Sequence, residues 1–356
     1  MSPRGWVQES RVRSRPMKPQ LSHPIFVLGC PRSGTTLLQQ MLHSHRRVAF
    51  PSETRFVHTA YEVRHTFGDL EREANRRALA EWIVHGEDTK FRVLGLDADA
   101  TIEEIVHGPP TLGSALAIIF RAYARRHGKP RWGDKRPSYF RRVAMLRRMF
   151  PDAQFVHLVR DGRDAVSSLV RMPWFQGDIY AAALTWREAI DTGKALSSRL
   201  GPRTFYELRY EDLVADPEEE LAKLCAFLGE DYDPEMTRAH EHARRTVPST
   251  RKWHLRTHEA PNTRAVGAWR DRLRVWEADL VEHVLASRLV ERGYTLTGTP
   301  RPAAAHLARF HRMAAHRWRS RHAQAVMDRL AQAREPNPVV SRLRGPVPVA
   351  GRPDRR

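Results

Sequence analysis

The sequence has 356 residues, with 60 Lys and Arg against 41 Asp and Glu, which gives a formal net charge of +19. Its hydrophobic content of 41% is enough for a buried core, and the composition excludes collagen, coiled coil and global disorder. The longest nearly apolar stretch, residues 112–120, is far shorter than the ~20 residues of a membrane-spanning helix. No signal peptide opens the sequence and only two cysteines occur, so we expect a soluble, cytoplasmic protein without a disulfide framework.

The basic charge is concentrated at the two ends of the sequence. Residues 1–20 carry a net charge of +4 and residues 299–356 carry +10, which leaves about +5 for everything between them. Proteins that bind DNA usually place their basic stripe on a folded recognition surface. We therefore expect no nucleic-acid partner, although a protein that binds nucleic acid or an anionic membrane through its basic ends remains an alternative.

The chain opens its folded part with a strand, a glycine-containing loop and a helix. Residues 25–29 form a short, continuous apolar run, as in a strand buried on both faces of a parallel sheet. Behind the loop, apolar residues recur at helical spacing over residues 37–45. Further strands are predicted at 154–159 and 204–208.

Helices alternate with these strands. Apolar spacing predicts one near residues 138–150, another from Ala165, and a third after Asp216. The third has strong boundary signals, because Asp216 can cap it, Pro217 suits its first position, and Gly229 lies beyond its end. The predicted fold is α/β, with a parallel sheet of the P-loop NTPase type flanked by helices.

The sequence suggests three regions. Residues 1–22 form a disordered lead-in, and residues 23–298 form the main domain. Residues 57–130 are rich in helix signals and are predicted to be an inserted cap over the carboxyl edge of the sheet. Residues 299–356 form a basic helical and Pro-rich extension. The loose apolar stripe of this extension indicates a helix that docks on the domain, or one that makes peripheral contact with an anionic membrane.

The loop Gly29–Thr36 has the glycine spacing of a P-loop, but Thr35 stands where a nucleotide-binding Lys is expected. Backbone N–H groups and the following helix N-terminus can still hold a phosphate, with Arg32 as the cation. The missing Lys disfavours a kinase-like nucleotide phosphotransferase, which remains the first alternative.

The segment Pro31–Leu38 resembles the 5′-phosphosulfate loop of sulfotransferases that use 3′-phosphoadenosine 5′-phosphosulfate (PAPS), in particular the protein-tyrosine and bacterial branch. The resemblance covers about residues 24–273. It implies that the loop binds the donor through five residues, namely Arg32, Ser33, Gly34, Thr35 and Thr36.

A second segment, Val159–Ser168, looks like the family's 3′-phosphate motif. Arg160 would leave the edge of the sheet as a planar fork for a phosphate, and Ser168 would return a hydroxyl from the next helix. Tyr210 lies in a stretch that matches the family's Arg-Tyr-Glu motif, whose Tyr contacts the adenosine. Ser249 and Arg264 lie in a late loop that, by resemblance, closes over the 3′-phosphate.

Two further residues carry the implied chemistry. Glu53 lies in a Glu-Thr-Arg triplet, as the catalytic base does in tyrosylprotein sulfotransferases, and a base is needed to remove the acceptor's proton. Lys135, predicted at a helix start, matches the family's Lys-x-Pro element, whose Lys meets the sulfonate. Arg32 and Lys135 would stabilise the charge of the transferring group.

The resemblance therefore implies an enzyme that transfers a sulfuryl group from PAPS to a hydroxyl and releases 3′-phosphoadenosine 5′-phosphate (PAP). No metal is expected, because side chains supply the cations. The acceptor is a metabolite, lipid, carbohydrate or tyrosyl group, and we favour a bacterial metabolite, lipid or sugar. The oligomeric state is not predicted.

Overall fold

The computed structural model describes residues 22–52, 54–241, 259–333, 335 and 338–349. Within these residues a parallel sheet of five strands forms the centre, in the order β2-β3-β1-β4-β5. Its central strand, β1, pairs with β3 on one side and β4 on the other. The strands are β1 Ile25–Gly29, β2 Val48–Ala49, β3 Arg131–Lys135, β4 Gln154–Val159 and β5 Phe205–Arg209. The predicted α/β fold class is confirmed.

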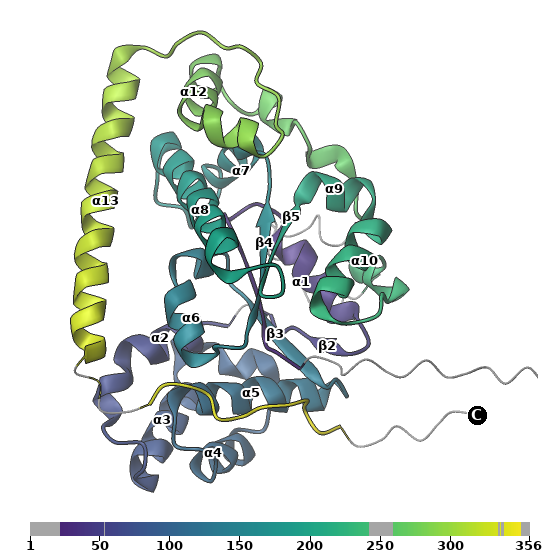
Figure 1. Ribbon diagram of the computed structural model, residues 1–356, viewed down its shortest axis with the longest axis vertical. Coiled ribbons are helices and arrows are strands. Elements are labelled where there is room, and N and C mark those ends of the chain that lie inside the picture. Colours follow the sequence, from purple (N-terminus) through teal and green to yellow (C-terminus); the bar gives the residue numbers. More distant parts are fainter. Residues whose placement is uncertain (1–21, 53, 242–258, 334, 336–337, 350–356) are drawn as a thin grey trace, which may run out of the picture.

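Helices cover both faces of the sheet. Ile25 and Val27 of β1 belong to one apolar cluster, whereas Phe26 and Leu28 belong to another, as the alternation of side chains along a strand requires. The first layer, on one side of the strands in Figure 1, consists of α1 Thr35–Ser44, α9 Tyr210–Ala215 and α10 Pro217–Leu228. The second consists of α5 Leu112–Arg126, α6 Val143–Met149, α7 Gly162–Leu169, α8 Ile179–Leu200 and α12 Val275–Glu291.

The strand predictions differ from the structure in two places. The strand predicted at 204–208 lies one residue too early, since β5 spans Phe205–Arg209. β2 and β3 were not predicted. The sequence of β3, Arg-Trp-Gly-Asp-Lys, contains no apolar run that would indicate a buried strand, although all five residues are buried. Arg131 is accommodated through hydrogen bonds to Leu228 O and to the Gln154 side chain, and such distant partners leave no local pattern in the sequence.

The helix predictions also need correction. The predicted helix 138–150 is two elements, a 3-10 helix at Pro137–Arg141 and then α6. α7 begins at Gly162 rather than Ala165, because the Asp161 carboxylate accepts a hydrogen bond from Arg163 N and caps the helix. The boundaries of α10 are confirmed.

Residues 57–130, which were predicted to be an inserted helical cap, consist mainly of helices. They include α2 Phe56–Val63, α3 Glu73–His85, α4 Ala98–Val106 and α5. α5 does more than cap an edge, because the Phe120 ring stacks on Trp132 of β3 with centroids 4.6 Å apart. This contact makes α5 part of the sheet's own core. The division of the chain into domains stays a prediction.

The basic extension begins with α13, Ala304–Ala333, which runs along the outside of the molecule past α8 and α12 (Figure 1). Its first half is docked: Phe310 is 1% exposed, and Arg309 forms an ion pair with Asp178 at 2.6 Å. Trp318, at the middle of the helix, and Met327, in its second half, are exposed. None of the helices in the described ranges is both long enough and apolar enough to cross a bilayer.

Residues 338–349 form a strap across the edge of the molecule. Gly113 N of α5 donates to Val339 O at 2.9 Å, Ser341 N donates to Met149 O at 2.8 Å, and Val347 N donates to Pro130 O at 2.7 Å. Just before the strap, the buried Glu335 carboxylate pairs with Arg64 and Arg148. The strap therefore ties α5 and the start of β3 to α6.

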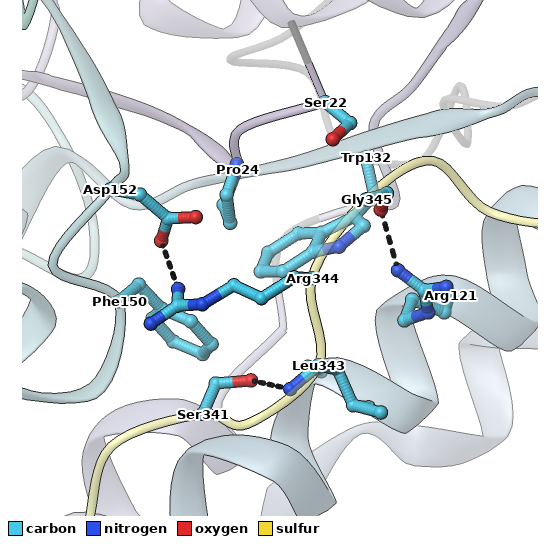
Figure 2. Close-up of a pocket in the computed structure, with 11 residues that line it drawn as sticks. Ser22, Pro24, Arg121, Trp132, Phe150, Asp152, Ser341, Leu343, Arg344 and Gly345 are labelled. Atoms are coloured by element: carbon cyan, nitrogen blue, oxygen red, sulfur yellow. Dashed lines mark hydrogen bonds and ion pairs between the residues drawn. The ribbon is translucent and has the colours of Figure 1, made fainter.

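A small pocket lies under this strap (Figure 2). It is bordered by Trp132, Phe150 and Arg344, and the Arg344 guanidinium pairs with Asp152 at 2.8 Å. Its volume of about 10 Å³ leaves room for about one water. Pro24, at the amino end of β1, also lines it, so the pocket lies at the opposite end of β1 from the Gly29–Thr36 loop.

Candidate active site

The loop between β1 and α1 has the backbone of an anion site. Arg32 and Gly34 both have left-handed conformations, with φ of 75° and 92°. α1 begins at Thr35, and its cap residue Gly34 has no side chain to accept from the first N–H groups. Those N–H groups and the helix dipole favour a bound anion at this end of the helix.

Gly34 is required for space as well as for its conformation. A Cβ atom built on it would lie 2.4 Å from Cδ2 of Tyr210, which is the first residue of α9. Tyr210 in turn lies against the Arg160 guanidinium, whose Cζ is 4.6 Å from the ring centroid. The predicted adenosine-contacting Tyr and the predicted phosphate loop are therefore in direct contact.

The second predicted motif meets the first. Arg32 Nε donates to Ser168 Oγ at 3.0 Å, and Arg160 donates to the main-chain oxygen of Arg32, also at 3.0 Å. Ser168 lies 136 positions after Arg32 in the chain, and Arg160 lies 128 positions after it. Their contact follows from the topology, because β1 and β4 are adjacent parallel strands whose carboxyl ends share one edge of the sheet.

Lys135 reaches the same place from the other neighbour of β1. It is the last residue of β3, in register with Val27, and its Nζ lies 3.4 Å from Thr36 Oγ1. The prediction that it opens a helix was wrong, since it ends a strand. The argument from the helix dipole therefore does not apply, and Lys135 is placed instead by the parallel pairing of β3 with β1.

Two buried polar atoms in this region have no hydrogen-bond partner among the described residues. They are Ser33 Oγ and Arg160 Nε, and their residues are 1% and 6% exposed. Such atoms are costly unless something else satisfies them, and both can donate to an anion. The loop and the neighbouring end of β4 therefore have donors that the described part of the chain does not use.

Residues 263–271, in the described part of the late loop, lie against Arg160. They are held by Asp164, a residue that the sequence analysis did not single out. The Asp164 carboxylate accepts from Gly267 N at 2.7 Å and from Trp269 N at 2.8 Å. Ala265 O accepts from Arg160 at 2.5 Å. Burial raises the pKa of Asp164, although Arg160 and the two N–H donors oppose this. The one signal for Asp164 in the sequence was its position, four residues after Arg160 of the predicted 3′-phosphate motif.

Not every predicted residue joins this group. The Arg264 side chain is 81% exposed and its nearest charged partner is Glu259 at 3.9 Å, so the structure leaves it in solvent. Glu53 and Ser249 lie outside the described residues. The residues that the structure brings together come from four strand ends and the late loop: Arg32, Ser33, Gly34, Thr35, Thr36, Lys135, Arg160, Ser168, Tyr210 and Ala265.

Behind Tyr210, a buried carboxylate connects the ends of two strands. Glu211 accepts from Asp161 N at 2.9 Å and from the Tyr294 hydroxyl at 2.9 Å. Burial raises the pKa of Glu211, and these hydrogen bonds partly offset the effect. Because Asp161 follows Arg160, this link fixes the main chain that carries the Arg160 side chain.

A family model described as "Sulfotransferase family" matches residues 24–234. The chain belongs to the sulfotransferase family. Two curated relatives are protein-tyrosine sulfotransferase 2 of Gallus gallus, 28% identical over 212 residues, and protein-tyrosine sulfotransferase A of Caenorhabditis elegans, 29% identical over 236 residues. These matches cover 58% and 64% of this chain, but 50% and 56% of those proteins.

A solved structure supports the fold. The sulfotransferase domain of the Synechococcus PCC 7002 olefin synthase superposes with a TM-score of 0.55 at 22% identity, over 80% of this chain and 98% of that one. The family model and the curated relatives confirm the resemblance to the sulfotransferases that the sequence showed. The matched region of the curated relatives is only about half their length, so their activities apply to this sulfotransferase only as a proposal.

Proposed function

We propose that this sulfotransferase transfers the sulfuryl group of PAPS to a hydroxyl-bearing acceptor. The observation that carries the proposal is the convergence of Arg32, Lys135 and Arg160 on the N-terminus of α1. Three buried or partly buried cations and a helix N-terminus at one place suit a ligand with several negative charges.

The residues present fit the two ends of such a donor. The N–H groups of α1, with Ser33 and Thr36, would hold the 5′-phosphosulfate. Arg160 and Ser168 would hold the 3′-phosphate, and the unused Nε of Arg160 is a donor available for it. Tyr210, which contacts both Gly34 and Arg160, would pack against the nucleoside between these groups.

The chemistry requires stabilisation of charge on the transferring group. As the acceptor oxygen attacks sulfur, the bond from sulfur to the phosphate oxygen breaks and negative charge develops on PAP. Arg32 and Lys135 offer fixed positive charge at that point, and their burial strengthens the interaction. Because side chains supply this charge, we expect the reaction to proceed without a metal ion.

The proposed base is Glu53, which would take the proton of the acceptor hydroxyl. The acceptor class is a tyrosyl, carbohydrate, lipid or metabolite hydroxyl, and the names of the curated relatives place a tyrosyl peptide in the panel to be tested. We place the reaction in the cytoplasm, where the two buried free thiols, Cys30 and Cys225, would stay reduced.

Calorimetric titration tests the donor site. We expect PAP to bind the purified protein in the presence of EDTA, and ATP with magnesium to bind much more weakly. Labelled PAPS and the acceptor panel would then report transfer. Binding of magnesium ATP but not of PAP would reject the proposal and favour a phosphotransferase.

The part of α13 from Trp318 onward supports one further proposal, peripheral contact with an anionic membrane. Trp318 is 61% exposed, and residues 318–333 carry three Arg against one acidic residue, Asp328. Vesicles with and without anionic lipid test it: binding that needs anionic lipid and falls with salt and in Trp318→Ser is expected. Equal binding by both kinds of vesicle, or none, would contradict it.

A further inference from the structure

Asp134 is a fully buried carboxylate beside the candidate active site, and no step proposed above uses it. It is the fourth residue of β3, in register with Phe26 of β1, and is 0% exposed. Because side chains alternate along a strand, Asp134 and Lys135 point to opposite faces of the sheet. Lys135 faces Thr36 of α1, so Asp134 faces the layer that contains α5 and α6.

Three segments donate hydrogen bonds to this carboxylate. Thr54 Oγ1 lies 3.4 Å from each carboxylate oxygen, and the Tyr139 hydroxyl donates to Oδ2. The main-chain N–H of Lys135 is the third donor. A buried carboxylate is expected to be paired in this way, but a core strand needs no carboxylate at all.

The donors matter because of their places in the chain. Thr54 directly follows Glu53, the base proposed above. Lys135 is the proposed sulfonate-binding cation, and Tyr139 lies in the 3-10 helix that leads away from it. Asp134 therefore connects the segment that follows β2 with the end of β3, and it fixes both next to the residues that the reaction needs.

We propose that Asp134 is a positioning residue for sulfuryl transfer: by accepting from Thr54, Tyr139 and the Lys135 main chain, it holds the Lys135 ammonium at the phosphate loop. The proposal rests on the proposed function. Asp134 itself does not touch the donor, since its side chain lies on the other face of the sheet from Thr36.

Burial and charge around Asp134 agree with this role. Burial raises its pKa to about 6, and the hydrogen bonds from Tyr139 and Lys135 N, together with the charges of Arg136 and Lys135, oppose the rise. The carboxylate is thus largely ionised at neutral pH, and the ionised form can accept from Thr54 and Tyr139 at once.

A double-mutant cycle with Lys135 tests the proposal without knowledge of the acceptor. The reaction is single-turnover cleavage of PAPS by water. The bond from sulfur to the phosphate oxygen breaks, a bond from the water oxygen to sulfur forms, and sulfate, PAP and the protons of water are released. The proteins are the full chain, Asp134→Asn, Lys135→Ala and the double variant, with affinity for PAP measured in parallel.

We expect Asp134→Asn to lower the cleavage rate about 10- to 100-fold, as misplacement of a reacting group does. Affinity for PAP should stay unchanged, because Arg160, Ser168 and the loop are not altered. The double variant should be no slower than Lys135→Ala alone, since one residue acts through the other. Tyr139→Phe, which keeps the carboxylate, should show the same pattern in weaker form.

Tyr180→Phe is the matched control. It removes the hydroxyl of another buried tyrosine, whose partner is His306 of α13, and it should leave both measurements unchanged. The positioning role alone would be overturned if the effects of Asp134→Asn and Lys135→Ala on the cleavage rate multiply in the double variant. It would also be overturned if Asp134→Asn lowers the affinity for PAP as much as it lowers the cleavage rate. Wild-type protein that binds no PAP would overturn the proposed function together with it.

Discussion

Arg160 donates a hydrogen bond to the main-chain oxygen of Arg32 at 3.0 Å, which joins the end of β4 to the loop after β1. The contact brings the Arg160 guanidinium to a loop that carries a second guanidinium, that of Arg32, and that leads into the N-terminus of α1. Positive charges gathered in one region repel unless negative charge offsets them. The Asp164 carboxylate, 3.8 Å from Arg160, supplies part of that negative charge, and a bound anion would add to it.

Replacement of Arg160 should weaken binding at the proposed 3′-phosphate site. We expect Arg160→Ala to weaken PAP binding about 10- to 100-fold, the usual cost of a lost hydrogen bond to a charged group. Arg160→Lys should restore only part of the affinity, because a point charge does not reproduce the planar fork. Calorimetry measures both, and Arg309→Ala, which removes a surface partner of Asp178, is the control. Unchanged affinity in Arg160→Ala would place the nucleotide elsewhere.

Gly34→Ala should disrupt the loop by two separable effects. The left-handed backbone at Gly34 costs about 1 to 2 kcal/mol for a residue with a Cβ. In addition, that Cβ would meet the Tyr210 ring at 2.4 Å. Gly128, which ends α5 in the hydrogen-bond pattern of a left-handed C-terminal glycine, also has a positive φ, of 62°, but nothing lies within 4 Å of its Cβ position. Gly128→Ala therefore reports the backbone effect alone, and urea unfolding of the two variants should show Gly34→Ala as clearly less stable. Equal losses would mean that Tyr210 moves aside freely.

Asp164→Asn should loosen the late loop. An amide offers one oxygen, so it can no longer accept from both Gly267 N and Trp269 N with two carboxylate oxygens. The loss of one buried hydrogen bond costs about 1 to 3 kcal/mol. Hydrogen exchange of the peptide that contains residues 263–271 should become faster, and PAP affinity should fall. The surface variant Asp191→Asn, which loses an ion pair with Arg288, should change neither. Unaltered exchange in Asp164→Asn would show that other contacts hold the loop.

The pKa of Asp134 predicts how stability depends on pH. Folding raises this pKa from 3.8 to about 6, so the folded state binds the proton more tightly than the unfolded state does. The contribution that protonation of Asp134 makes to the free energy of unfolding is then complete below pH 3.8, and it is lost as the pH rises to about 6. Urea unfolding of wild type and Asp134→Asn should give a stability difference that changes in this window, by up to about 3 kcal/mol, and is constant above it. A difference independent of pH would contradict a raised pKa.

Phe310→Ala tests whether α13 is docked in solution. Phe310 is buried, and the Arg187 guanidinium lies over its ring, so truncation should leave a cavity and cost about 3 to 5 kcal/mol. Met327→Ala, on the exposed half of the same helix, should change stability by no more than about 0.5 kcal/mol. Urea unfolding compares them. If both changes are equally mild, the helix does not rest on α8.

The parts of the site that could be predicted are those with short-range signals. The run Ile25–Gly29, the glycines of the loop, and the Arg160–Ser168 spacing are all local, and the structure places them together at one sheet edge. The contact between Arg32 and Ser168 follows from these, because adjacent parallel strands bring their carboxyl ends together. The resemblance to a family then supplied the roles proposed for Lys135 and Tyr210.

The parts that could not be predicted depend on distant partners. Three of the five buried residues of β3 carry a charged side chain. Arg131 is stabilised there by the Glu230 and Gln154 side chains and by the main-chain oxygens of Leu228 and His23. Propensity alone assigns no strand to such a sequence. Asp164 was missed for the same reason, since its two N–H donors lie more than 100 residues later. Arg264 shows the reverse case, a basic residue at a suitable position in sequence whose side chain faces solvent.

The strap at residues 338–349 has a consequence for how the chain reaches its native state. Arg121 of α5 donates to Gly345 O, a residue 224 positions later, and the neighbouring contacts of the strap are similarly remote in sequence. During synthesis, α5 and β3 leave the ribosome long before residues 338–349 are made. Part of their surface therefore stays exposed to solvent until the strap is synthesised. Contacts of such high sequence separation slow folding, and they expose apolar surface to aggregation in the interval. The order in which this protein is made therefore sets when its sheet edge becomes protected.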